Sequence, residues 1–179
     1  MPRHTLFDAL RDSHTIQRSL CRRLTHTRHP QRREMLFLQL KVELEAHAAA
    51  EERFLYVPML MTDAGLTATR HALSEHHDIE ELCEDLSVRD KASDAWTETM
   101  AKLSHKVHHH LREEERKFFK VGGRLLSTRH KAQLAQQYED EIVRLRRSYS
   151  AQYRTVSVNA AGAVGLSRRA AQRPAAPAA

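Results

Sequence analysis

The motif His-x-x-x-Glu stands at corresponding positions in the two halves of this chain of 179 residues, at His47–Glu51 and at His110–Glu114. In a helix, residues i and i+4 lie on one face about one turn apart, so each motif places an imidazole beside a carboxylate. Both groups are common metal ligands. Because an unpartnered buried carboxylate is costly, the fold must give each pair either a partner or solvent.

A lone histidine precedes each motif by about the length of one helix and its turn. His14 lies 33 residues before His47, and His76 lies 34 residues before His110. The two halves of the chain therefore repeat one helical hairpin, with ligand-type residues at matching positions. This repeat predicts two hairpins that fold around a shared metal site.

Hydrophobic periodicity divides the chain into five helical segments. Their apolar residues recur at intervals of three and four, as on one face of a helix. Thr5, Ser93 and Ser127 stand where helix N-caps are expected. The predicted helices span residues 6–27, 30–63, 67–86, 93–121 and 127–154.

Proline and glycine mark the expected interruptions. Pro58 should kink or end the second helix, Gly65 should stop it, and the Gly122–Gly123 pair should break the fourth. Short connections make the first four helices antiparallel neighbours. We therefore predict an all-α protein, an up-down-up-down four-helix bundle with an additional C-terminal helix outside the bundle or at one end.

Residues 155–179 are mostly Ala, Gly, Pro and Arg, without helical periodicity. Too little apolar surface is available there to offset the entropy lost on ordering the chain, which predicts a disordered tail. The expected organisation is one metal-binding domain of residues 1–154 followed by a tail of residues 155–179.

The composition limits which cellular compartment and which kinds of partner are expected. No run of about 18 apolar residues is present and no secretory signal precedes the first helix, so we expect a cytoplasmic protein without a membrane span. The net charge of +6 is concentrated in residues 1–33 and in the tail. That distribution suits weak contact with an acidic partner such as nucleic acid, although a solvated basic surface is the commoner explanation.

The chain has thirteen histidines, and their positions around the predicted helices indicate which of them face the bundle axis. Steps of three and four residues from Trp96 reach His110 and pass over His109. In the third segment the same test favours His76 over His77, two residues that differ by only one position.

Six polar residues thus lie at matching heights on four apolar stripes. One such histidine is more often a hydrogen-bonded core residue, but six are better explained by a common ligand. Imidazoles and carboxylates suit iron, manganese or zinc, and the lack of thiolates argues against a structural zinc site. The candidate metal ligands are His14, His47, Glu51, His76, His110 and Glu114.

The same residues resemble the hemerythrin-like, or HHE cation-binding, domain family over about residues 6–120. The resemblance implies a non-haem centre of two iron ions held by the six candidate ligands. It is carried by His14, by residues 43–52 with Tyr56 and Pro58 after them, by Glu75–His76 with Ile79, and by residues 110–115 followed by Phe118 and Phe119.

The chain departs from the oxygen-carrying members of that family at the third helix. Those members have His-x-x-x-His there, whereas this chain has Ala72 and Glu80 four residues to either side of His76. Their fourth helix has His-x4-Asp, whereas here Glu114 follows its histidine at +4. One ion is then short of a protein ligand and is left to bind water, hydroxide or Glu80.

These features favour a sensor or scavenger of a small oxygen- or nitrogen-based ligand, such as O2, peroxide or NO, or a protein that handles iron. A peroxidase- or catalase-like di-iron enzyme is the alternative. A helical nucleic-acid- or protein-interaction module is a further alternative, but it leaves the six converging polar residues unexplained. A ferritin-like bundle is disfavoured because that class has Glu-x-x-His at i, i+3.

Two further expectations concern buried groups. Without metal, burial should favour protonated Glu51 and Glu114. Cys21 and Cys83 each follow a lone histidine by seven residues, on two helices expected to be diagonal in the bundle. Their Cα atoms should then be too far apart for a disulfide, which requires less than about 7 Å.

Overall fold

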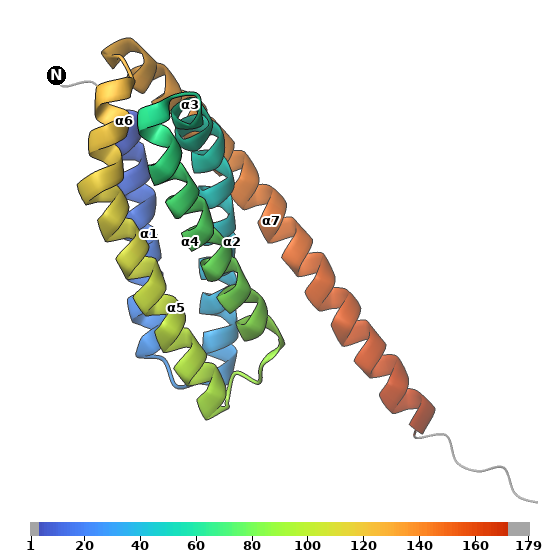
Figure 1. The fold of residues 1–179 in the computed structure, drawn as a ribbon. Coiled ribbons are helices and arrows are strands. Elements are labelled where there is room, and N and C mark those ends of the chain that lie inside the picture. The colour runs from blue at the N-terminus through green and yellow to red at the C-terminus, as the bar shows by residue number, and fades with distance from the viewer. Residues whose placement is uncertain (1–3, 172–179) are drawn as a thin grey trace, which may run out of the picture.

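A computed structural model describes residues 4–171, with side chains as far as Thr155. The described residues are helical apart from short connections, which confirms the predicted all-α class. Four helices, α1 (Leu6–Thr25), α2 (Pro30–Glu51), α4 (Asp63–Val88) and α5 (Asp94–Glu113), form an up-down-up-down bundle (Figure 1). A further helix, α7 (Thr128–Ala171), packs on the outside of α1 and α2. None of the helices in the described range has the length and apolar character needed to cross a membrane.

The predicted helix starts are where the capping residues place them. Thr5 immediately precedes α1. Ser93 Oγ accepts a hydrogen bond from the backbone N–H of Trp96 at 3.1 Å, and Ser127 Oγ accepts one from His130 at 3.2 Å. Each cap satisfies a backbone donor that the first turn of a helix leaves unpaired.

Two short π-helical turns interrupt the bundle at equivalent positions of the repeat. They are η1 (Glu52–Tyr56) and η2 (Glu114–Phe118), and they lead into α3 (Val57–Leu60) and α6 (Phe119–Leu125). Pro58 lies in α3, so the predicted kink takes the form of a π turn that ends just before it. Such turns accommodate one extra residue and are frequent at functional sites.

The glycines predicted to stop helices lie inside helices, so both of those predictions are wrong. Gly65 is in the first turn of α4, where an added Cβ would collide with the carbonyl oxygen of Met59. Gly122 is within α6, where a Cβ would lie 3.3 Å from Leu55. Both glycines therefore allow neighbouring elements to approach closely, rather than ending a helix.

Two apolar clusters fill the bundle and leave a polar layer between them. The cluster near α3 and α6 includes Leu10 and Leu55, and the cluster at the other end includes Leu40 and Leu103. Both clusters are built from the predicted apolar stripes. The second also contains the two cysteines, which are buried and unbonded to each other, as predicted.

Helix α7 is held to the bundle by an apolar face and by ion pairs, one of which involves Arg146. Ile142 and Leu145 are buried against the first cluster. The guanidinium of Arg146 donates to both oxygens of Glu43, at 2.7 and 2.6 Å, and Ser13 donates to the same carboxylate at 2.5 Å. One bidentate pair thus joins α7 to α2 and α1.

The last helix extends beyond its predicted end at Arg154, because α7 continues to Ala171. Residues 155–171, expected to be part of a disordered tail, are helical, and residues 172–179 lie outside the described range. Each residue added to a formed helix gains a backbone hydrogen bond, and alanine has the highest helix propensity, so this segment continues without an apolar face. Figure 1 shows it diverging from the bundle.

Deleting residues 155–179 should leave both metal content and melting temperature unchanged. Among the described side chains, Tyr153 is the last that contacts the bundle, through Glu45. Circular dichroism melts and metal analysis check this result. A longer deletion, from residue 138 onwards, is the comparison and should destabilise the bundle because it also removes Tyr138 and Arg146. A shorter protein that melts early would place the domain boundary beyond Arg154.

Candidate metal centre

All six candidate ligands come together in the polar layer between the two apolar clusters. Their donor atoms form two overlapping groups, and within each group the atoms lie within 4.8 Å of one another. Glu51 belongs to both groups. The first donor group is His14, His47, Glu51 and Glu114, and the second donor group is Glu51, His76 and His110.

Each carboxylate lies between two imidazole Nε2 atoms, which reflects the repeat in the sequence. One imidazole comes from its own helix and the other is the lone histidine of the opposite half. The Oε2–Nε2 distances are 3.3 Å to His47 and 3.6 Å to His76 for Glu51, and 3.3 Å to His14 and 3.7 Å to His110 for Glu114. The two halves therefore build a centre with approximate twofold symmetry.

The opposite nitrogen of every imidazole, Nδ1, is held by another side chain, which sequence reasoning did not predict. Such contacts fix the ring and leave Nε2 facing the centre, as outer partners do around metal-bound histidines. Glu52 and Glu115 directly follow Glu51 and Glu114, the glutamates of the two motifs. This position in the sequence could have indicated that they contact the imidazoles. The contacts are His14 with Glu115 at 2.8 Å, His47 with Tyr138 at 2.8 Å, His76 with Glu52 at 3.0 Å, and His110 with Glu75 at 3.0 Å.

Several donor atoms at the centre have no hydrogen-bond partner. They are Nε2 of His14 and His47, both oxygens of Glu51, and Oε2 of Glu114. Leaving one buried polar atom unsatisfied costs about 1–3 kcal/mol, so five together need an explanation. Each is an acceptor, or becomes one on losing a proton, and a cation between them would satisfy all five. The residues present therefore fit a metal site.

The imidazoles and carboxylates of the centre shift one another's pKa values. Burial lowers the pKa of His14, but the nearby carboxylates of Glu114 and Glu115 outweigh this and raise it to about 9. Burial also lowers the pKa of His76, but Glu51 and Glu52 outweigh this effect and raise the pKa to about 10. Burial raises the pKa of Glu51, but His47 and His76 hold it well below its usual value. The expectation of a protonated Glu51 is wrong, because the neighbouring imidazoles of His47 and His76 favour its ionised form.

Tyr56 is a further oxygen donor at the centre that the ligand prediction omitted. Its buried hydroxyl donates to Glu114 Oε1 at 2.8 Å and lies 3.4 Å from His76 Nε2. Burial, followed by Glu114, raises the pKa of this phenol well above its usual value. The equivalent residue of the other half is Phe119, which stacks on His14 as Tyr56 stacks on His76. The centre is therefore asymmetric, and comparing the two halves of the sequence would have shown it.

The structure also shows where the alternative ligand candidates His77, His109 and Glu80 lie. The His109 side chain is 47% exposed and that of His77 is 69% exposed, whereas those of His110 and His76 are 2% and 9% exposed. The phase test therefore identified the inward-facing histidines. Glu80 belongs to neither donor group and lines a pocket beside the centre.

A helical bundle with four histidines and two carboxylates converging at its axis defines a class of helical metal-binding proteins. The family model for the hemerythrin HHE cation binding domain matches residues 5–121, and the chain belongs to this family. The fold is similar to the crystal structure of a hemerythrin HHE cation binding domain-containing protein from Mycobacterium kansasii. That likeness has a TM-score of 0.77 and 18% sequence identity, and covers 85% of this chain and 93% of the other. No curated protein matches the chain.

Replacing Tyr56 with phenylalanine should alter the centre where the two donor groups meet, because its hydroxyl contacts Glu114 of the first group and His76 of the second. The variant keeps the ring stacked on His76 but loses the oxygen beside Glu114 and His76. We expect weaker binding of one of two metal ions and a changed visible spectrum of the iron-loaded protein. Titration with iron(II) followed by metal analysis measures both. Tyr149→Phe, in the pocket wall, is the matched control and should behave as the unmodified chain. Equal behaviour of both variants would remove Tyr56 from the centre.

Proposed function

We propose that this chain is a non-haem di-iron protein that senses or scavenges a small oxygen- or nitrogen-based ligand, such as O2, peroxide or NO. The observation that carries the proposal is the pair of overlapping donor groups with five unsatisfied buried atoms. Two groups that share Glu51 would suit two ions better than one ion. Imidazole and carboxylate donors suit iron, with manganese and zinc as competitors.

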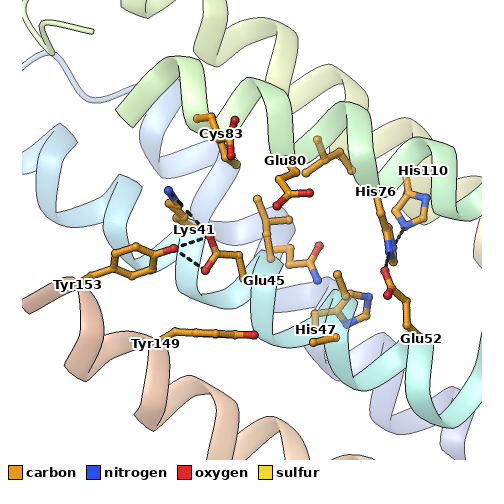
Figure 2. A pocket seen from close by; sticks show the side chains of 16 residues that line it. Lys41, Glu45, His47, Glu52, His76, Glu80, Cys83, His110, Tyr149 and Tyr153 are labelled. Carbon is orange, nitrogen blue, oxygen red and sulfur yellow. Dashed lines mark hydrogen bonds and ion pairs between the residues drawn. The ribbon is translucent and has the colours of Figure 1, made fainter. Parts of the chain in front are cut away.

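The two ions would not be equivalent. The first donor group offers two imidazoles and two carboxylates, whereas the second offers two imidazoles and the shared Glu51. The phenol of Tyr56 lies beside both groups, 2.8 Å from Glu114 and 3.4 Å from His76. When bound, the metal supplies a Lewis-acidic coordination position at which an exogenous ligand can bind. A pocket with a volume of about 490 Å³ reaches His47, His76 and His110, so the centre is accessible from the surface (Figure 2).

The chain's own residues orient the donors and control protons. Glu52 and Glu75 hold the Nδ1 atoms of His76 and His110, which keeps each Nε2 facing the centre. The apolar clusters above and below exclude water from the remaining faces. The Tyr56 hydroxyl donates to Glu114, so it would also be placed to donate a hydrogen bond to a ligand bound there.

A peroxidase- or catalase-like activity is the second candidate. Its support is the pocket, which is larger than a diatomic ligand requires, together with the Tyr56 proton at the centre. Adding hydrogen peroxide to the iron-loaded protein distinguishes the two proposals. A scavenger or sensor reacts stoichiometrically, with one change in its visible spectrum, whereas an enzyme releases oxygen or oxidises a donor over many turnovers. An iron-loaded protein whose spectrum responds to none of O2, peroxide and NO would contradict both.

A further inference from the structure

The pocket beside the centre lies between α2 and α4, with α7 along its rim (Figure 2). Buried histidines, His47 and His110, form part of its wall, and the exposed Glu80 and Glu84 form another part. It therefore connects the surface of the bundle with the donor groups. Tyr149 and Tyr153 of α7 stand at the rim, where Tyr153 donates to Glu45.

The wall of this pocket is acidic. Four glutamates line it, and Lys41 is the single lysine or arginine among its lining residues, all of which are described. Lys41 Nζ lies 3.9 Å from Glu45, so its positive charge is offset by an ion pair within the wall. The four glutamates are Glu45, Glu52, Glu80 and Glu84. A cleft lined by one sign of charge attracts ions of the other sign, and this cleft attracts cations.

Helix α4 places carboxylates in sequence along the pocket. Glu84, Glu80 and His76 are spaced by four residues, so they lie on one face at intervals of about 6 Å. Among the described residues, neither Glu80 nor Glu84 has a hydrogen bond or an ion pair. Two free carboxylates therefore lead, one helical turn at a time, to a histidine of the second donor group.

A buried amide supports the same interpretation. Gln17 is 1% exposed, lines the pocket, and its Nε2 has no hydrogen-bond partner. A buried amide without a partner costs free energy unless the pocket holds a polar occupant. Because the amide can present either its N–H or its carbonyl oxygen, it can bind a water of a hydrated cation or the cation itself.

We propose that this pocket is the route by which a divalent cation reaches the donor groups, with Glu84 and Glu80 capturing it before His76 and Glu52 receive it. Carboxylate oxygens bind a hydrated cation weakly and quickly, whereas imidazole nitrogens hold a transition metal more strongly, so the order of donors favours inward movement. A neutral ligand gains nothing from four carboxylates, and an anion is repelled by them. The inference rests on the proposed metal centre and adds the path to it.

Uptake of cobalt(II) by the metal-free chain tests this route, because cobalt binds nitrogen and oxygen donors and its visible bands report binding without redox chemistry. The double variant Glu80→Gln/Glu84→Gln should take up cobalt on the order of tenfold more slowly at low salt, with the same final stoichiometry. Raising the salt concentration should slow the unmodified chain and reduce this difference. The matched control is Glu81→Gln/Glu98→Gln, which removes equal charge from exposed positions outside the pocket and should match the unmodified chain.

A steric variant provides a second, independent arm. Ala48 lines the pocket, and Ala48→Phe should slow uptake while leaving the final cobalt content unchanged. Uptake rates equal to that of the unmodified chain in both the double variant and Ala48→Phe would overturn the route. Equal slowing by the control pair would also overturn it, since net charge alone would then set the rate. An unmodified chain that binds no cobalt would overturn the metal centre itself, a result distinct from any change in rate.

Discussion

Replacing His110 with alanine should abolish binding of at least one metal ion per chain, whereas replacing His109 should leave the metal content unchanged. His110 Nε2 lies 3.1 Å from His76 Nε2 and faces the second donor group. The side chain of His109 is half-exposed and pairs with the outer carboxylate Glu75, at 3.2 Å. The two variants differ by one position in the sequence and by about 100° around the helix.

Metal analysis after iron(II) loading measures the outcome for both variants, and circular dichroism verifies that both remain folded. A small loss of affinity in His109→Ala is compatible with the weakened support of Glu75. Equal loss of metal from both variants would mean that the inward-facing histidine has been assigned wrongly.

Metal removal should lower the melting temperature by a large margin. A cation that binds only the folded state stabilises it by mass action, by about 4 kcal/mol when it is present at ~1,000 times its Kd. For a domain of this size that corresponds to roughly 10 °C. The physical source is the set of five buried donor atoms that have no hydrogen bond within the described residues.

Thermal melts of the iron-loaded protein with and without a chelator provide the measurement. The double variant Glu51→Gln/Glu114→Gln removes both carboxylates and should melt at one temperature irrespective of chelator. If the unmodified chain also shows superimposable curves, no metal is coupled to its folding, which would count against a buried centre.

The fold was predictable because local patterns agree with tertiary packing. Apolar residues at intervals of three and four predicted the buried faces of α1, α2 and α5 down to Leu10, Leu40 and Leu103. The six candidate ligands interrupt those stripes at matching heights, so the sequence also predicted that they meet. Helical phase was sufficient for this because a one-residue shift moves a side chain by about 100°.

The remaining features depend on neighbours that are distant in the sequence. Glycine often ends a helix, so Gly65 and Gly122 were predicted to be helix stops. Each lies instead where a neighbouring element packs so closely that a Cβ would contact it. Helix α7 passes its expected end because a formed helix continues without an apolar face. Tyr138, which supports His47 at 2.8 Å, lies 91 residues away, and no local pattern indicates that contact.

Metal content is the most direct test of the centre formed by the two donor groups. The chain is to be prepared free of metal, loaded anaerobically with iron(II), freed of excess iron, and analysed for iron per chain together with its visible spectrum after exposure to air. Two overlapping donor groups predict about two iron ions per chain, and a His14→Ala/His76→Ala variant that binds substantially less. A chain that remains free of iron after loading, or binds equal amounts with and without those histidines, would contradict the account.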